Sequence, residues 1–212
     1  VDRRQRQMCI RDSYDDIADY ILVKQGGKIN AVGTPDKPIV MTSEKEEPGA
    51  WGGIHICGRA HTNAEGGKGS SEIGGAVYGG NDDADNSGTL QYIRLEYTGF
   101  AFDEEHEANG ISFYGVGNGT IVDHCQAYKG SDDGFEFFGG SVNVSNLVAV
   151  SCSDDSFDWT EGWNGKGTNL VAYQEAESTL GYDCDCLMEC DNNGSNNAAT
   201  PVAHPVLKNL IL

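Results

Sequence analysis

Asp132-Asp133-Gly134-Phe135-Glu136-Phe137 returns one period later as Asp154-Asp155-Ser156-Phe157-Asp158-Trp159. The offset is 154 − 132 = 22 residues. A second pair of segments keeps nearly the same step, because residues 145–149 (SNLVA) recur at residues 168–172 (TNLVA), an offset of 168 − 145 = 23. Repeats of this length in a glycine-rich, strand-like sequence are typical of a solenoid, in which each unit buries a face against the next.

The repeated motif alternates with the period of a strand, so that Phe135 and Phe137 share one face while Glu136 and Phe138 share the other. Stacked coils, about 4.8 Å apart, would place equivalent residues above one another, and we expect Phe135 and Phe157 to stack inside. An antiparallel sandwich is the alternative, but it requires tight hairpin turns and no fixed register. We therefore predict an all-β chain that forms a right-handed parallel β-helix of about 22-residue coils, with the hand given by the preference of parallel crossovers.

Further segments extend the pattern. Residues 88–99 match residues 119–130 in length, in their terminal glycines and in the position of a tyrosine, and residues 109–113 fit one period before residues 133–137. Residues 185–189 fit after the second copy of the motif, and residues 208–212 restart the NLVA type of strand. Since the chain stops within that strand, we expect truncation at the C-terminus. Residues 59–86 contain few branched apolar side chains and are predicted to form a long loop excursion from the core.

The first residues differ in character from the rest. Residues 3–12 (RRQRQMCIRD) resemble the translation of a transposon adaptor used in sequencing libraries. We therefore predict that residues 1–13 are adaptor-derived and that residues 14–212 are a single β-helix domain fragment, truncated at both ends. A natural basic arm for nucleic acid or membrane is the alternative. The lack of a signal peptide is then uninformative, and Cys9 is not a functional cysteine.

The composition excludes some partners. The net charge is −19, and because the four arginines and two aspartates of residues 1–13 contribute +2, residues 14–212 carry −19 − 2 = −21. Binding of nucleic-acid phosphate depends on clusters of lysine and arginine, so nucleic acid is not an expected partner. No apolar run approaches the roughly 20 residues of a membrane span. The acidity indicates either a solvated surface or a surface that binds cations.

The aligned coils should place acidic side chains in outward columns. One column holds Ser112, Glu136, Asp158 and Glu189, a second holds Asp132 and Asp154, and a third holds Asp133 and Asp155. Carboxylates one coil apart raise each other's pKa or share a cation, and hard oxygen ligands suit Ca²⁺. We predict a Ca²⁺ site formed by Asp132, Asp154, Glu136 and Asp158. The alternative is that the paired aspartates cap turns at the coil corners through backbone N–H groups.

The same acids are the candidates for catalysis, namely Glu136, Asp158, Asp133 and Asp155. Inverting glycosidases place two carboxyl groups about 6.5–9.5 Å apart around a water molecule, which adjacent coils could supply. Residues 130–133 (GSDD) resemble the paired-aspartate motif of polygalacturonases, whose Gly-His-Gly and Arg-Ile-Lys motifs have no counterpart here. A polysaccharide lyase usually needs a lysine or arginine base. With only 14 such residues, the chain would need Ca²⁺ to bridge to an acidic polysaccharide.

Aromatic and cysteine side chains are the remaining candidates. Trp159, Trp163 and Phe138 lie near the acidic column and could form a platform for sugar rings; burial in the core is the alternative. Six cysteines remain besides Cys9, and an even number allows disulfides of undetermined pairing: Cys57, Cys125, Cys152, Cys184, Cys186 and Cys190. The spacing of the last three fits no common zinc pattern, so a local disulfide or packed thiols are favoured over a soft-metal site.

The segments INAVGT (29–34), KPIVMTS (37–43), WGGI (51–54), DDGFEFFGG (132–140), DDSFDWTEG (154–162) and DNN (191–193) carry a resemblance to a known group. They resemble exported, often lipid-anchored, right-handed β-helix proteins of Bacteroidetes-type bacteria. The resemblance implies a pectin-lyase-like β-helix that is secreted or at the cell surface, and it supplies no catalytic residues, because the group's function is unassigned. We expect a binding or structural module directed to glycans; a polysaccharide hydrolase or lyase, Ca²⁺-dependent in one version, is the alternative.

Overall fold

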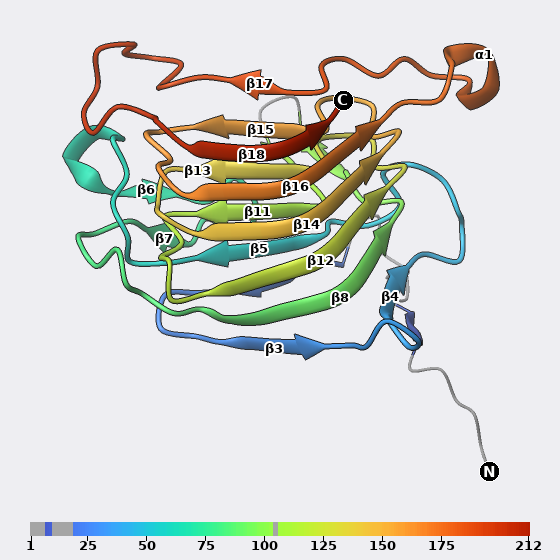
Figure 1. The fold of residues 1–212 in the computed structure, drawn as a ribbon, viewed down its shortest axis with the longest axis horizontal. Coiled ribbons are helices and arrows are strands. Elements are labelled where there is room, and N and C mark those ends of the chain that lie inside the picture. The colour runs from blue at the N-terminus through green and yellow to red at the C-terminus, as the bar shows by residue number, and fades with distance from the viewer. Residues whose placement is uncertain (1–6, 10–18, 104–105) are drawn as a thin grey trace.

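The computed structural model describes residues 7–9, 19–103 and 106–212. Two parallel sheets run along the molecule (Figure 1). The first sheet is ordered β1 (Gln7–Cys9), β4 (Ile39–Thr42), β8 (Gly88–Glu96), β12 (Ile121–Tyr128), β14 (Asn143–Val150), β16 (Lys166–Tyr173) and β18 (Val206–Ile211), with β3 (Ile29–Val32) paired to β8. The second sheet is ordered β17 (Glu189–Cys190), β15 (Phe157–Thr160), β13 (Phe135–Phe138), β11 (Ile111–Tyr114), β5 (Ile54–Cys57) and β2 (Ile21–Val23). The chain passes from one sheet to the other and back, so the prediction of a right-handed parallel β-helix is confirmed.

The repeat of 22 residues holds only in part of the solenoid. Phe157 pairs with Phe135, an offset of 157 − 135 = 22, and Gly167 pairs with Val144, an offset of 167 − 144 = 23. Between β5 and β11 the offset is 111 − 54 = 57, as given by the pairing of Ile111 with Ile54. The coil is longer there because residues 59–86 leave it and return.

One predicted register is wrong by a single residue. Residues 88–99 and 119–130 align by sequence with an offset of 119 − 88 = 31, but Val122 pairs with Leu90, an offset of 122 − 90 = 32. The observed register stacks the buried Val122 on the buried Leu90. The predicted register would instead have matched Leu90 with Ile121, whose side chain is 49% exposed. A slip of one residue exchanges the two faces of a strand, so burial of apolar surface decides the register.

The core consists of side chains that repeat from coil to coil. The rings of Phe135 and Phe157 stack with centroids 5.5 Å apart, and those of Phe113 and Phe137 with centroids 5.0 Å apart. All four rings are buried. The predicted inward stacking of Phe135 on Phe157 is therefore confirmed, and each fully buried ring contributes about 1.5–3 kcal/mol through the hydrophobic effect.

A ladder of asparagines follows the first sheet on its outer side. The Nδ2 atom of Asn169 donates to Oδ1 of Asn146 at 2.8 Å, and Nδ2 of Asn209 donates to Oδ1 of Asn169 at 2.9 Å. All three residues have positive φ, between 54° and 58°. Asparagine tolerates this left-handed conformation better than most residues with a Cβ, so the ladder occupies strand positions whose backbone has positive φ.

Residues 59–86 pack against the outer face of the second sheet. They include a short 3₁₀ turn, η1 (Glu65–Gly67), and an antiparallel hairpin of β6 (Gly69–Ser70) and β7 (Val77–Tyr78). Tyr78 of the hairpin contacts Tyr114 and donates a 2.9 Å hydrogen bond to Glu161. A second hairpin, β9 (Ala101–Asp103) and β10 (His106–Glu107), precedes β11, and α1 (Glu177–Leu180) follows β16. The excursion thus covers part of the outward face that the coils leave open.

The start of the described chain belongs to the first sheet. Of the predicted adaptor-derived segment, residues 1–13, only Gln7–Cys9 fall within the described residues, where they pair with β4; the origin of the segment stays a prediction. Among the residues that the structure describes, no helix has the length and apolar character required to cross a membrane.

Candidate functional site

A column of polar side chains points outward along the second sheet. Ser112, Glu136 and Asp158 are register partners on β11, β13 and β15, and Glu189 on β17 pairs with Asp158. This is the column that the sequence repeat predicts. His55 on β5 pairs with Ser112 and extends the column by one more coil. Equivalent positions of the repeat thus become neighbours in space, because the coils stack in register.

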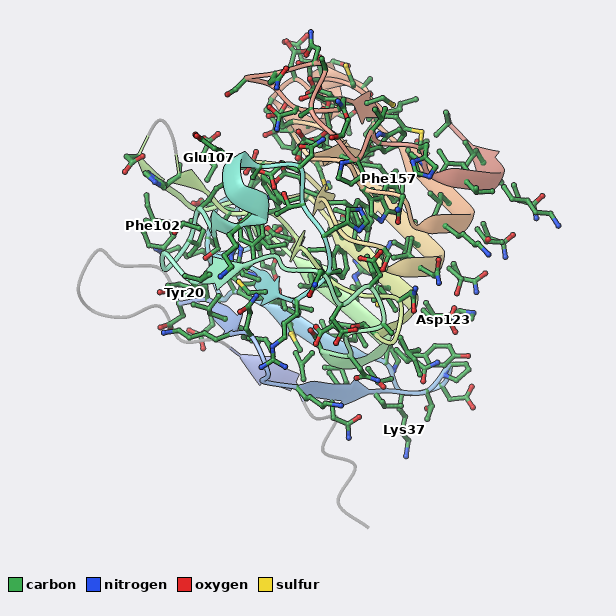
Figure 2. The ribbon with its side chains drawn as sticks, turned by 90° about the vertical axis from the view of Figure 1, so that its left-hand side faces the viewer. Tyr20, Lys37, Phe102, Glu107, Asp123 and Phe157 are labelled. Carbon is green, nitrogen blue, oxygen red and sulfur yellow. The ribbon has the colours of Figure 1, made fainter. Side chains whose placement is uncertain are left out.

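The acids of this column line a cleft of about 270 Å³ beside the second sheet. Its lining consists of eight carboxylic acids and one amide: Glu72, Glu107, Asn109, Asp132, Asp133, Glu136, Asp154, Asp158 and Glu189. No lysine or arginine belongs to this set. Glu72 comes from the excursion and Glu107 from β10; Figure 2 shows Glu107 on the same side of the solenoid as Phe102 and Tyr20, opposite Asp123.

The carboxylates form overlapping groups whose oxygens lie within 4.8 Å of one another. The groups are Asp132, Asp133 and Asp154; Asp133, Glu136 and Asp158; and Asp155, Asp158 and Glu189. The four predicted Ca²⁺ ligands therefore do not form one group. They fall into two groups that share Asp133, which the predicted ligand set omitted.

Burial and mutual repulsion raise the pKa values of these acids. Burial is the first cause for each, and it raises the pKa of Asp132 to about 7, of Glu72 to about 7 and of Asp158 to about 6. The pKa values of Asp133 and Glu136 are raised well above their ordinary range by burial and then by neighbouring carboxylates. A carboxylate in such a place is stabilised either by a proton or by a cation.

Two of the aspartates also bind backbone groups of the next coil. Oδ1 of Asp133 accepts a hydrogen bond of 2.9 Å from the backbone N–H of Asp155, and Oδ1 of Asp155 accepts one of 2.7 Å from the N–H of Cys186. The capping role that was the alternative to a ligand role is therefore present at Asp133 and Asp155. Each carboxylate has a second oxygen, so capping leaves Asp133, which lines the cleft, one oxygen outside that bond.

Among the described side chains that line the cleft, two buried oxygens have no hydrogen-bond partner. They are Oδ1 of Asn109 and Oδ1 of Asp158, both buried at the atomic level. Asn109 as a whole is 1% exposed. Its Nδ2 donates to Oγ of Ser112 at 3.0 Å and to Oε2 of Glu136. A buried oxygen without a partner is costly, and it marks a place where water or an ion completes the structure.

Comparison with known proteins assigns this architecture to a family. A family model described as a pectate-lyase-like beta helix domain matches residues 5–212. The chain belongs to the pectate-lyase-like β-helix domain family. No curated protein and no solved structure gave a match to it. The match begins within the segment that we predict to be adaptor-derived, whose origin it does not test.

The predicted sugar platform is wrong for this member of the pectate-lyase-like family. Trp159 is 8% exposed and pairs with Phe137, so it points into the coil. Trp163 is 1% exposed, and its ring stacks on Phe137 with centroids 4.2 Å apart. Phe138 points outward, but the excursion covers it, with Tyr78 and Tyr114 in the same buried cluster. Burial in each case removes the ring face that a sugar would need.

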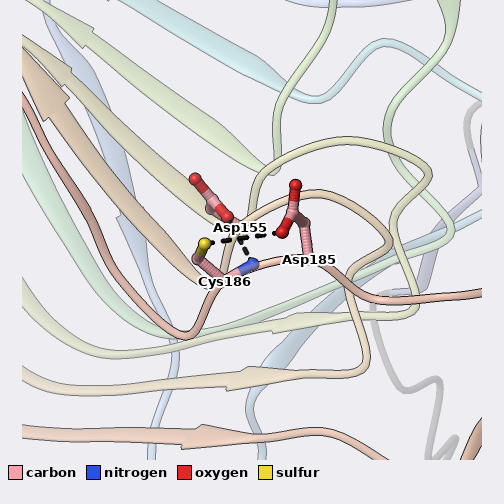
Figure 3. A group of neighbouring side chains, drawn as sticks. All are labelled: Asp155, Asp185 and Cys186. Carbon is pink, nitrogen blue, oxygen red and sulfur yellow. Dashed lines mark hydrogen bonds between the residues drawn. The ribbon is translucent and has the colours of Figure 1, made fainter.

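The six cysteines other than Cys9 are all free thiols. Cys57, Cys125 and Cys152 are buried, whereas Cys186 is exposed. Figure 3 shows Cys186 beside Asp155 and Asp185, a group whose ligand atoms also lie within 4.8 Å of one another. Cys186 is therefore neither in a disulfide nor packed in the core. The local disulfide and the packed thiol that its spacing favoured are both wrong for this residue.

Three residues of the cleft were missed by the sequence analysis. Asn109 could have been found, because residues 109–113 align with residues 133–137 and this places Asn109 one coil from Asp133. Glu72 and Glu107 lie outside the repeat and carry no comparable signal. The structure brings them to the cleft through the excursion and the β9–β10 hairpin.

The chemistry of this pectate-lyase-like domain follows from its donor set. Carboxylate and amide oxygens are hard ligands, and Ca²⁺ takes about six to eight of them. The lining residues that the structure describes include no lysine or arginine to attract an anionic sugar directly. The cleft can therefore hold protons or hard cations, and a bound cation would offset part of its negative charge.

Proposed function

We propose that this chain is an exported or cell-surface module that binds polysaccharide at the acidic cleft, with Ca²⁺ as the bridge between protein and sugar. The observation that carries the proposal is the gathering of eight carboxylic acids in one cleft with no lysine or arginine in its lining. Such a surface repels an anionic chain unless a divalent cation lies between them. Membership of the pectate-lyase-like β-helix family supports a glycan as the partner.

Export and a lipid anchor are part of the proposal and rest on the resemblance of the repeat motifs to exported β-helix proteins. Because the composition is strongly acidic, we do not propose nucleic acid as a partner. Proteinase accessibility of the full-length protein on intact cells tests the location. Complete protection from the protease on intact cells would contradict export to the surface.

The binding function is tested by retention on immobilised polysaccharides. We expect the chain to bind polygalacturonate in millimolar Ca²⁺ and to elute with a chelator, whereas a neutral mannan should retain it less. The double variant Glu136→Gln/Asp158→Asn should lose retention. The matched control is Asp36→Asn/Glu47→Gln, which makes the same change of charge at two exposed positions outside the cleft and should bind as the parent does. Equal retention with and without Ca²⁺ would refute the proposal.

A polysaccharide-cleaving activity is the second candidate, and a separate observation favours it. Asp158 and Asp132 have pKa values of about 6 and about 7, the range in which a carboxylic acid serves as a general acid near neutral pH. Among the described residues of the cleft there is no lysine or arginine to act as the base of a lyase. For this second candidate function we therefore propose hydrolysis and not elimination. Release of reducing ends from a polysaccharide panel, absent in Asp158→Asn, would establish it.

A further inference from the structure

His61, near the start of the excursion formed by residues 59–86, lies between two hydrogen-bond acceptors. Its ring Nδ1 is 2.7 Å from Oδ1 of Asp83, and its Nε2 is 3.0 Å from the carbonyl oxygen of Gly162. A carboxylate and a carbonyl oxygen accept hydrogen bonds and donate none. A neutral imidazole carries one N–H and can donate to only one of these oxygens, whereas the charged ring carries two and donates to both.

We infer that protonated His61 is a pH-sensitive clasp that holds the excursion against the solenoid, and that the excursion loosens when the ring loses its second proton. The two hydrogen bonds, here called the His61 clasp, join separate parts of the chain. Asp83 lies near the far end of the excursion, and Gly162 lies in the corner between β15 and β16. After the proton is lost, one ring nitrogen directs a lone pair at an oxygen, which is repulsive. The inference goes beyond the proposed function, since it does not depend on what the cleft binds.

The state of Asp83 assigns the proton between the two side chains. Burial alone would raise the pKa of Asp83, but hydrogen bonds from the ring and from the backbone N–H of His61 outweigh it and lower that pKa. The backbone bond reaches the same Oδ1 atom at 3.1 Å. An ionised Asp83 has no proton to donate to Nδ1. The ring is therefore the donor on this side as well as towards Gly162.

The other charged groups of the segments that meet at the clasp are Glu161 on the solenoid and Arg59, Asp82 and Asp85 on the excursion. The carboxylate of Glu161 accepts hydrogen bonds from Thr62 and Tyr78, so it also binds the excursion. Arg59 and Asp85 lie 4.0 Å apart as an ion pair, and Asp82 accepts from the backbone N–H of Ala84. Of the side chains in this set and the clasp, His61 is the one whose ordinary titration falls near neutral pH.

Loosening of the clasp would uncover a buried thiol. Cys57 on β5 is fully buried and packs with Ala76 and Tyr78 of the β6–β7 hairpin, which belongs to the excursion. Its Sγ lies 3.9 Å from the carbonyl oxygen of Ala76. Glu72, which lines the acidic cleft, lies in the same hairpin. The clasp therefore connects pH to the exposure of Cys57 and to the position of one wall of the cleft.

Alkylation of Cys57 by iodoacetamide, followed by mass spectrometry of the intact chain's peptides, tests the inference. Each rate is divided by that of the denatured chain at the same pH, which removes the ordinary dependence on thiolate. From about pH 5.5 to about pH 9 we expect the protection of Cys57 to fall about 10-fold or more, while Cys125 in the core stays protected. In His61→Gln, whose amide does not titrate, this fall should disappear.

A second variant separates the clasp from the charge of the cleft. Burial raises the pKa of Glu72 to about 7, so its ionisation also repels the excursion from the acidic cleft as the pH rises. Glu72→Gln removes that contribution and should keep the fall in Cys57 protection. Circular dichroism at both pH values checks that each variant is folded. The inference is overturned if Cys57 of the parent is equally protected at both pH values, if the fall survives in His61→Gln or vanishes in Glu72→Gln, or if Cys125 becomes reactive together with Cys57.

Discussion

Glu136 on β13 lies directly opposite Asp158 on β15, with oxygens of the two carboxyl groups within 4.8 Å of each other. The two residues are 158 − 136 = 22 apart in sequence, so the repeat itself brings like charges together. Burial and like-charge neighbours are unfavourable for ionised carboxylates. A fold that keeps such a pair with no lysine or arginine among the described residues that line the cleft gives up stability at this site, which is typical of functional clefts.

Neutralising either member of this pair should stabilise the cation-free protein. In Glu136→Gln or Asp158→Asn a buried carboxyl group that is costly to ionise becomes a neutral amide of the same shape. We therefore expect the midpoint of thermal unfolding at pH 8 to rise in the presence of a chelator. A gain of about 1 kcal/mol corresponds to about 2–4 °C for a chain of this size. The exposed Asp36→Asn should change the midpoint by less than about 1 °C. A fall of the midpoint in both cleft variants would contradict this account.

The stability should also depend on pH, in a direction opposite to ordinary acid denaturation. Burial raises the pKa of Asp132 from 3.8 to about 7 and of Glu72 from 4.5 to about 7. An acid whose pKa is higher in the folded state binds its proton more tightly there, so its contribution is present below pH 4 and is lost as the pH rises towards 7. Without divalent cations, we expect the chain to unfold at a higher temperature at pH 5 than at pH 8. Millimolar Ca²⁺ at pH 8 should raise the unfolding temperature towards its value at pH 5.

The asparagine ladder provides a test of the fold that does not involve the cleft. Asn169→Ala removes hydrogen bonds to Asn146 and Asn209 and places a less tolerant residue at φ 58°. We expect a loss of about 1–2 kcal/mol in the free energy of unfolding. Asn169→Gly accepts the conformation but not the hydrogen bonds, so it should lose less. The control, Asn143→Ala at an exposed position of β14, should be nearly neutral; equal losses in Asn143→Ala and Asn169→Ala would refute the ladder's role.

The internal stack of phenylalanines should contribute more than any surface group. Phe157 is 1% exposed and stacks on Phe135, so Phe157→Ala should destabilise the chain by about 3–5 kcal/mol in denaturant unfolding. Phe157→Leu retains most of the apolar volume and should cost clearly less. Tyr173→Ala, at a side chain that is 58% exposed, serves as the matched aromatic control, with an expected change below about 0.5 kcal/mol.

The burial of tryptophan gives a spectroscopic prediction. The chain has three tryptophans, Trp51, Trp159 and Trp163, and all are buried. We expect blue-shifted emission and weak quenching by iodide, with no change when polysaccharide is added in the presence of Ca²⁺. Efficient iodide quenching of the folded chain, or a shift of emission on sugar binding, would show that a ring faces the ligand after all.

Much of this structure could be predicted because a parallel solenoid converts sequence spacing into position. Stacking in register places Ser112, Glu136, Asp158 and Glu189 in one column, so alignment of the repeats was sufficient to find it. The same alternation already placed Trp159 on the inner face with Phe157, since the two are two residues apart on one strand. Position on the strand, and not closeness in sequence to the acidic column, therefore decides that Trp159 faces the core.

The sequence by itself determined the coils, their core and the charged column, because local alternation and a regular repeat are sufficient to bury the same face in each turn. The tertiary structure alone decided what lies above that column. Glu72 and Glu107 reach the cleft from segments that do not repeat, and residues 59–86 fold over Phe138. Such contacts depend on where a long excursion closes against the outer face of the sheet, and no local pattern encodes that closure. The repeat therefore specifies the acids, and the excursion and the β9–β10 hairpin complete the cleft in which those acids meet.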